Sequence, residues 1–329
     1  MVRNVVDSVL LIGFGGPTQG CCQRYQPCLG SGQESPEAYC FVSEILARRI
    51  KGNRPINSER VRQVVAHYTE LGGFSPFYQL TSTQASALSI KVNLPVYIGM
   101  RNWRPFLLEA LANMIDDGCR KVLAIILSPF QTFTSWQEYQ QDVDQALESL
   151  STQNGQWPDI MVSYASVWSA EDGYISAVTE KIRSSCINWS NDRFLSAHLI
   201  FTAHAIPIIA AERSPYSQQF AQSSKLVADR LKKKFGLAYQ SAPENSPIDW
   251  TEPDINTLIP SLDLSVSTDV IIVPLGFTCD HVEVLYDLDR EAKLVAENNG
   301  FEVTRVPTVG TSAAFISLLA QKVQTANET

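Results

Sequence analysis

The chain has 329 residues, of which 45% are hydrophobic and 18% charged, a balance that excludes a disordered chain and is typical of a soluble globular protein. Its formal net charge is −8, and its only block of basic residues is in LKKKF at 231–235, so the composition does not indicate a nucleic-acid-binding protein. No apolar run reaches the roughly 18 residues that a membrane-spanning helix needs. We therefore expect a cytoplasmic protein with at most peripheral membrane contact.

Short apolar runs rich in β-branched residues alternate along the chain with segments of helical period. In chain order, the runs are residues 9–14, 95–100, 122–128, 160–166, 198–204, 270–277 and 302–309. Helical segments lie between them, for example at 58–71, 105–118 and 223–235. Most runs are apolar throughout, which is typical of strands buried on both faces of a parallel sheet. The alternation predicts an α/β protein with doubly wound, Rossmann- or flavodoxin-like parallel sheets.

The chain also reads as two similar halves, because a strand followed by a turn opens each of them, with GFGGP in the first and TAHAIP in the second. The polar stretch 148–159 is the best linker. We expect one domain over residues 1–155 together with 306–329, whose C-terminal helix packs back, and a second domain over 156–305. In such sheets ligands bind beyond the carboxyl ends of the strands. A cleft between the domains is therefore the expected site.

Four of the seven cysteines gather near the start of the chain, at Cys21, Cys22, Cys28 and Cys40. Their spacing matches no zinc or ferredoxin pattern, although thiolates are the usual ligands of iron–sulfur clusters. A Gly/Ser/Gln-rich loop with free thiols is the favoured interpretation, and a metal or [2Fe–2S] site is the alternative. The remaining cysteines are expected to be buried or half-buried free thiols.

Charged side chains follow two of the later predicted strands. His204 ends the run 198–204, and a cluster of acids at 280–291 follows the run 270–277. If this cluster is helical, Glu283, Asp287 and Glu291 fall at i, i+4 and i+8 and form one stripe that rises about 6 Å per step. Such a ladder of carboxylates suits a hard or borderline cation, and a solvated acidic helix face is the alternative. His281 is a less favoured second imidazole.

Five segments together resemble ferrochelatases, the enzymes that insert Fe²⁺ into a porphyrin in haem synthesis. They are TAHAIP (202–207), GFTCDHVEVLYDLDREA (276–292), LGGFSPFYQLTSTQA (71–85), VYIGMRNWRPFLLEAL (96–111) and YQSAPENSPIDWTEPDI (239–255). The resemblance runs in order from about Leu10 to Leu319, and the D-H-x-E-x-L-Y-D-x-D pattern is its most specific part. It implies a lyase with a class II chelatase-like fold, which takes a porphyrin and ferrous iron as substrates and releases two protons.

The resemblance also implies roles for individual positions. His204 corresponds to the active-site histidine and Glu283 to the facing glutamate, and both are expected to be catalytic. His204, Glu283, Asp287 and Glu291 are the expected metal contacts. The expected porphyrin contacts are Phe14, Ser75, Arg101, Phe130, Tyr239, Trp250 and Tyr286. Because a histidine has a pKa near neutrality, we expect His204 to accept pyrrole protons, with Glu283 facing it across the crevice between the domains.

Several points stay open at this stage. The alternatives are a chelatase that places Co²⁺ or Ni²⁺ in a tetrapyrrole such as sirohydrochlorin, and a tetrapyrrole-binding protein without turnover. The C-terminal cysteines of cluster-containing ferrochelatases are missing, so neither a [2Fe–2S] cluster nor any other resident cofactor is expected. The porphyrin is protoporphyrin IX or coproporphyrin III. Residues 36–72 lack an apolar lip, and Arg48, Arg49 or Lys51 could meet the carboxylates of coproporphyrin III. A monomer is expected.

Overall fold

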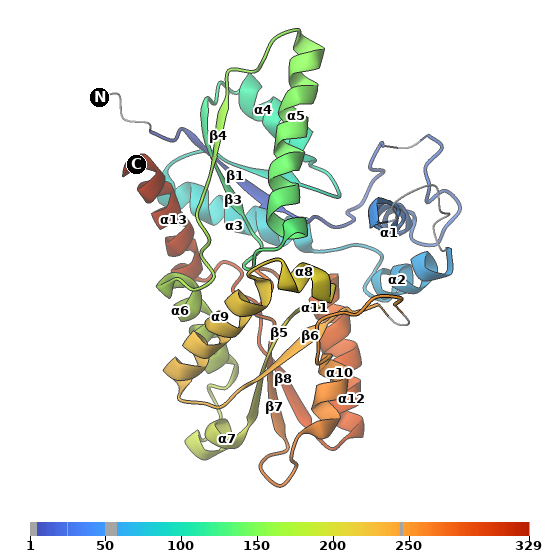
Figure 1. Cartoon of the computed structure of the whole chain (residues 1–329), viewed down its shortest axis with the longest axis vertical. Helices are drawn as coiled ribbons and strands as arrows, with labels where there is room; N and C mark the ends of the chain where they lie inside the picture. Colours follow the sequence, from blue (N-terminus) through green and yellow to red (C-terminus); the bar gives the residue numbers. More distant parts are fainter. Residues whose placement is uncertain (1–4, 25, 50–57, 244–245, 329) are drawn as a thin grey trace.

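The computed structural model describes residues 5–24, 26–49, 58–243 and 246–328, and it contains two parallel sheets of four strands each (Figure 1). The first sheet has the order β2-β1-β3-β4, with β1 (Ser8–Gly13), β2 (Val96–Met100), β3 (Lys121–Ile126) and β4 (Met161–Tyr164). The second has the order β6-β5-β7-β8, with β5 (His198–His204), β6 (Gly236–Gln240), β7 (Asp269–Val273) and β8 (Glu302–Arg305). Every pairing is parallel, and both sheets have the same strand order. The predicted doubly wound α/β architecture is confirmed.

Helices flank both sheets. In the first half they are α1 (Pro36–Arg49), α2 (Ser58–Glu70), α3 (Phe77–Val92), α4 (Leu107–Asp116), the π-helix η1 (Phe133–Gln137) and α5 (Glu138–Asn154). In the rest of the chain they are α6 (Asp172–Ser185), α7 (Asn191–Ser196), α8 (Ile208–Glu212), α9 (Tyr216–Leu231), α10 (Ile255–Leu258), the 3₁₀ turn η2 (Ile259–Ser261), α11 (Val282–Tyr286), the π-helix η3 (Asp287–Ala292), α12 (Lys293–Asn298) and α13 (Ala313–Glu328). None of the helices in the described ranges is both long and apolar enough to cross a membrane.

The sequence of β1 shows why its run is apolar throughout. Val9 and Leu11 belong to a hydrophobic cluster with residues of α3 and α13, whereas Leu10 and Ile12 belong to another cluster with residues of α4 and α5. Successive side chains of a strand point to opposite faces of the sheet, so both faces of β1 are buried. All four residues have no exposed surface. This burial on two faces distinguishes the central strands from the alternating pattern of a sheet that faces water.

The two halves share part of their core. The cluster that contains Leu11 also contains Leu199 of β5, Phe201 of β5 and Phe315 of α13. Helix α13 contacts both α3 and α6, so the C-terminal helix packs back against the first half. Strand β4 pairs with β3 although it follows residue 155, so the first sheet continues beyond the predicted domain boundary. The polar stretch used to place that boundary is largely the end of α5.

Candidate active site

His204 is the last residue of β5, a central strand of the second sheet. Its Nδ1 atom contacts the carbonyl oxygen of Ala205, and its main-chain carbonyl accepts a hydrogen bond from the hydroxyl of Tyr216 at 2.8 Å. A ring nitrogen that donates to a carbonyl leaves the other nitrogen with a lone pair. The side chain is 25% exposed, so it is partly open to solvent.

Glu283 lies in the first turn of α11, in the segment that follows β7. Its Oε1 atom is 3.8 Å from Nε2 of His204, and its side chain is 34% exposed. This separation is too long for a direct hydrogen bond, but a bridging donor or acceptor can contact both groups. The arrangement brings an imidazole base and a carboxylate together at the carboxyl ends of parallel strands, as the sequence predicted.

One part of that prediction is wrong. We expected His204 and Glu283 to face each other across the crevice between the domains, yet β5 and β7 are neighbours in the second sheet. Both side chains therefore belong to the second half of the molecule. The segment with Glu283 nevertheless meets the first half, because Val282 and Tyr286 share a hydrophobic cluster with Phe14 and Phe41. The pair lies where the two halves come together.

Three buried tyrosines that the sequence did not identify lie within electrostatic reach of Glu283. They are Tyr68 of α2, Tyr139 of α5 and Tyr216 of α9. Burial raises the pKa of each phenol, and the negative charge of Glu283 raises it further. These side chains therefore keep their protons, and the phenols that the charge of Glu283 influences come from both halves of the chain.

The acidic segment is not a plain α-helix, because the π-helix η3 separates α11 from α12. Asp287 begins η3, is 7% exposed and accepts a hydrogen bond from the hydroxyl of Ser241. Burial raises the pKa of Asp287 well above its ordinary value, and the charges of Glu283 and Glu291 add to this although the Ser241 hydrogen bond opposes it. Such a carboxyl group can hold a proton, and metal roles for Asp287 and Glu291 stay predictions.

His281, the less favoured second imidazole, caps α11. Its Nδ1 atom accepts a hydrogen bond from the main-chain N–H of Glu283 at 3.2 Å. Its ring lies between Phe77 and Phe277, with centroid distances of 5.4 and 5.0 Å. Burial lowers the pKa of His281, so the ring stays neutral and can accept this hydrogen bond. The sequence signal for this role is the position of His281 directly before the first helical residue.

Phe14 and Arg101, two predicted porphyrin contacts, follow β1 and β2. Phe14 lies edge-on to Phe41, with the ring centroids 6.2 Å apart. Arg101 is ion-paired with Glu138 and, at 2.9 Å, with Asp142, so its guanidinium group is held at the start of α5. These partners were not visible from the sequence, and the porphyrin roles stay predictions.

Ser75, a third predicted contact, is 7% exposed. Its N–H donates to the carbonyl of Pro17 at 2.8 Å, and its hydroxyl accepts the N–H of Phe77 at 3.3 Å. These bonds hold the GGFSP turn against the turn that follows β1. Ser75 therefore supports the loop of Phe14, whether or not it touches a ligand.

Phe130 and Tyr239 lie deeper than a surface contact would. Phe130 is 1% exposed and packs against Tyr216 and Phe220, with centroid distances of 5.7 and 5.5 Å. Tyr239 is 7% exposed and its hydroxyl is 3.2 Å from the hydroxyl of Ser217. In this structure both rings belong to the core beside the His204 strand, and their predicted contact with porphyrin stays a prediction.

The last two predicted contacts are closer to the surface. The indole N–H of Trp250 donates to the hydroxyl of Ser246 at 2.8 Å. The ring of Tyr286 stacks on His67 of α2, with a centroid distance of 3.8 Å and an interplanar angle of 9°. His67 of α2 thus joins the helix that carries Glu283 to the first half.

The cysteine-rich stretch packs against α1. Cys22 and Cys40 are buried with their sulfur atoms 3.5 Å apart, Cys28 joins the same hydrophobic cluster, and Cys21 is exposed. Within the described ranges, no three His, Cys, Asp or Glu side chains are grouped so that they could hold a metal ion. The free-thiol interpretation agrees with this arrangement, and the expectation that no cofactor is needed stays a prediction.

Gly276 holds the exit of β7 against the end of β5. A Cβ atom at this position would lie 2.9 Å from both Cα and Cβ of Ala203. We expect Gly276→Ala to push this loop away from His204, lower the turnover rate and destabilise the protein by about 1–3 kcal/mol, as overpacking does. Denaturant unfolding and an iron-insertion assay measure the two effects. Gly236→Ala is the matched control, because its Cβ would have no neighbour closer than 3.6 Å; equal behaviour of the two variants would contradict the prediction.

Comparison with known proteins gives one family over nearly the whole chain. The family model described as Ferrochelatase matches residues 6–327. The ferrochelatase of Deinococcus radiodurans is 30% identical over 325 residues, which cover 96% of this chain and 94% of that protein. The coproporphyrin III ferrochelatase of Streptomyces griseus is 30% identical over 330 residues, which cover 94% of this chain and 82% of that protein.

Among solved structures, SirB from Bacillus subtilis with Fe³⁺ is similar, with a TM-score of 0.57 and 11% identity. The similarity covers 97% of this chain and 94% of SirB. At this level of identity the comparison shows a shared fold alone. It agrees with the class II chelatase-like architecture predicted from the sequence.

Proposed function

The chain belongs to the ferrochelatase family, lyases that insert ferrous iron into a porphyrin in haem synthesis, and we propose that its porphyrin substrate is coproporphyrin III. The observation that carries the chemistry is the approach of Nε2 of His204 to Oε1 of Glu283, at 3.8 Å. Metallation requires a free-base porphyrin to lose two pyrrole protons while the iron loses water ligands. A base beside a carboxylate meets both needs.

In the proposed mechanism, Nε2 of His204 accepts the pyrrole protons. Glu283 takes them on, or stabilises the imidazolium that forms, because opposite charges attract strongly in a partly dehydrated site. Asp287 is the next acceptor, since it follows Glu283 by about one helical turn and burial raises its pKa well above the ordinary value. Iron insertion then leaves the protein with protons that pass outward along η3.

The choice of coproporphyrin III rests on charge. Arg24 and Arg48 both pair with the buried Glu44, and the Nη1 atom of Arg48 donates to the side-chain oxygen of Asn102 at 3.0 Å. Asn102 in turn donates to the carbonyl of Phe14 at 3.1 Å, so these guanidinium groups lie beside a predicted porphyrin contact. Guanidinium groups bind carboxylates in fork geometry, and coproporphyrin III carries more carboxylates than protoporphyrin IX. Several relatives bear the name coproporphyrin III ferrochelatase.

Two other predictions belong with this proposal. Arg49 and Lys51 were suggested as further carboxylate contacts, but Lys51 lies outside the described residues and the side chain of Arg49 is not described. We also propose that the enzyme acts in the cytoplasm as a monomer without a resident cofactor. Size-exclusion chromatography with light scattering and metal analysis of the purified protein test the last two points.

The test of the substrate is a comparison of initial rates under anaerobic conditions with Fe²⁺ and each porphyrin. We expect kcat/KM to be at least about 10-fold higher for coproporphyrin III, the effect of roughly one additional charged contact. Arg48→Met should reduce that preference, whereas Arg120→Met, at the opposite end of the first sheet, should keep it. An equal or higher rate with protoporphyrin IX would reject the substrate proposal while leaving the family assignment in place.

A further inference from the structure

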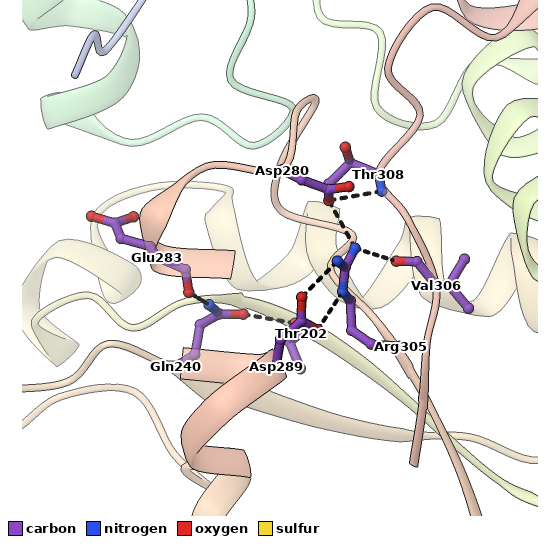
Figure 2. A network of polar contacts seen from close by, with 8 residues as sticks. All are labelled: Thr202, Gln240, Asp280, Glu283, Asp289, Arg305, Val306 and Thr308. Carbon is purple, nitrogen blue, oxygen red and sulfur yellow. Dashed lines mark hydrogen bonds and ion pairs between the residues drawn. The ribbon is translucent and has the colours of Figure 1, made fainter. Parts of the chain in front are cut away.

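Arg305 is the last residue of β8, and its guanidinium group binds two carboxylates of the acidic segment (Figure 2). Its Nε and Nη2 atoms donate to the two oxygens of Asp289 at 2.7 and 2.8 Å, and Nη1 donates to Oδ1 of Asp280 at 3.0 Å. The first interaction is a fork in which two parallel hydrogen bonds join one guanidinium to one carboxylate. Two acids of the 280–291 cluster therefore already have a cationic partner, and neither belongs to the predicted ladder of Glu283, Asp287 and Glu291.

The two carboxylates bracket Glu283 along the chain. Asp280 lies in the loop before α11, where it also accepts the N–H of Thr308 at 3.1 Å, and Asp289 lies in η3. The carboxylate of Glu283 points away from this cluster (Figure 2). Arg305 thus holds the segment on both sides of Glu283 without touching the glutamate itself.

A second contact fixes Glu283 from the sheet. The side-chain amide of Gln240 donates to the main-chain carbonyl of Glu283 at 2.8 Å and accepts the hydroxyl of Thr202 at 2.9 Å (Figure 2). Gln240 is the neighbour of His204 in the register of β6 and β5. The His204 strand and the Glu283 helix are therefore tied together, and Arg305 supplies the ties on the side of β8.

The contacts that Arg305 makes with Asp280 and Asp289 require an arginine. The side chain of Arg305 is 15% exposed. Burial would lower the pKa of the guanidinium, but the hydrogen bonds and charges of Asp289 and Asp280 outweigh it and the pKa is raised, so the cation is permanent. A lysine would keep the charge and lose the two-pronged geometry. Asp289 lies inside the π-helix η3, so Arg305 ties this helix to the end of β8, and π-helices often occur at functional sites.

We propose that Arg305 is a positioning residue, which holds Asp280 and Asp289 so that Glu283 is kept opposite His204. The inference rests on the proposed role of Glu283 in metal insertion. Residues that orient a reacting group without touching substrate commonly change rates by about 10–100-fold when they are removed.

The test is a double-mutant cycle between Arg305→Met and Glu283→Gln, with Fe²⁺ and coproporphyrin III as substrates. We expect Arg305→Met alone to lower kcat by about 10–100-fold while porphyrin binding, measured by fluorescence quenching, stays unchanged. In the Glu283→Gln background the same substitution should change kcat little, because a residue that acts through Glu283 has nothing left to position. Arg305→Lys should recover only part of the rate.

The control is Arg193→Met. Arg193 makes the same forked pair, with Asp269 at 2.6 and 3.0 Å, and also contacts Glu302 at 3.2 Å, at the opposite ends of β7 and β8. It should leave kcat at the wild-type value. If Arg305→Met does not fold, Asp289→Ala serves in its place, since it removes the fork and leaves the contact with Asp280. A wild-type kcat for Arg305→Met or Asp289→Ala, or losses that multiply with that of Glu283→Gln, would overturn the inference, whereas an inactive wild-type protein would count against the proposed function.

Discussion

Replacement of His204 by alanine is expected to abolish iron insertion, with a loss of at least about 10³-fold in kcat, because removal of a general base costs about 10²–10⁴-fold and no other described imidazole can take its place. His281 is neutral, and its Nδ1 atom is already used as the cap of α11. Porphyrin binding should persist, since His204 supplies a proton acceptor and not the aromatic surface. Metalloporphyrin absorbance measures the rate, and fluorescence quenching measures binding.

Two comparisons make this test specific. His198→Ala removes the histidine at the other end of the same strand, where Nε2 lies 3.1 Å from the carbonyl oxygen of Asp263, and should keep full activity. Added imidazole should restore part of the rate of His204→Ala if the lost function is proton transfer. Undiminished turnover of His204→Ala would reject its assignment as the base.

The fold was predictable because a strand that is buried on both faces of a sheet has a mainly apolar sequence. Residues 9–14 and 198–204 were recognised as strands from their mainly apolar character, which the clusters on the two sides of each sheet explain. Strand β6 (Gly236–Gln240) was missed. It begins at a glycine that follows three lysines and Phe235, and its last residue, Gln240, is polar although it is fully buried. The polar side chain of Gln240 links the His204 strand to Glu283. This link can be recognised only in the three-dimensional structure, where both partners are seen.

The proximity of His204 and Glu283 was predictable from the sequence, but the geometry around them was not. His204 and Glu283 were identified from their positions at strand ends and from the family resemblance, and they do lie together. The sequence could not show that Asp280 and Asp289 are neutralised, because their partner Arg305 comes from the next strand. The sequence analysis also expected His204 and Glu283 to face each other from different halves, because the sequence does not show which strands are neighbours in a sheet.

The structure divides the acidic residues that follow β7 into those with structural contacts and those proposed to act in the reaction. Six acidic or imidazole groups follow β7 closely in sequence, but Asp280 and Asp289 serve structure and His281 caps a helix. The roles of Glu283, Asp287 and Glu291 toward substrate or protons stay proposals. The ladder keeps the three members that the sequence indicated, and its first member, Glu283, is the one beside the proposed base.

Replacement of Glu283 by glutamine should give the second-largest loss, about 10²–10³-fold in kcat, because glutamine has nearly the same shape and hydrogen-bonding reach but can neither carry a proton nor stabilise an imidazolium. The fold should be unaffected, since the main-chain contacts of residue 283 with Gln240 and His281 are kept. Removal of the charge should also lower the pKa of Asp287, which Glu283 raises, and so weaken the proposed proton acceptor behind it. Initial rates with Fe²⁺ and coproporphyrin III measure the loss.

Glu297→Gln is the matched control on the same helical segment, because the Oε1 atom of Glu297 lies 3.8 Å from Nζ of Lys293 on the exposed face of α12. It should behave as the wild-type protein, since an exposed ion pair contributes about 0–1 kcal/mol to stability and takes no part in proton transfer. The combination of His204→Ala with Glu283→Gln should be scarcely slower than His204→Ala alone, because the two groups act on the same proton. Independent, multiplying losses would show that the glutamate works on a different step from the histidine, and the shared proton path would have to be abandoned.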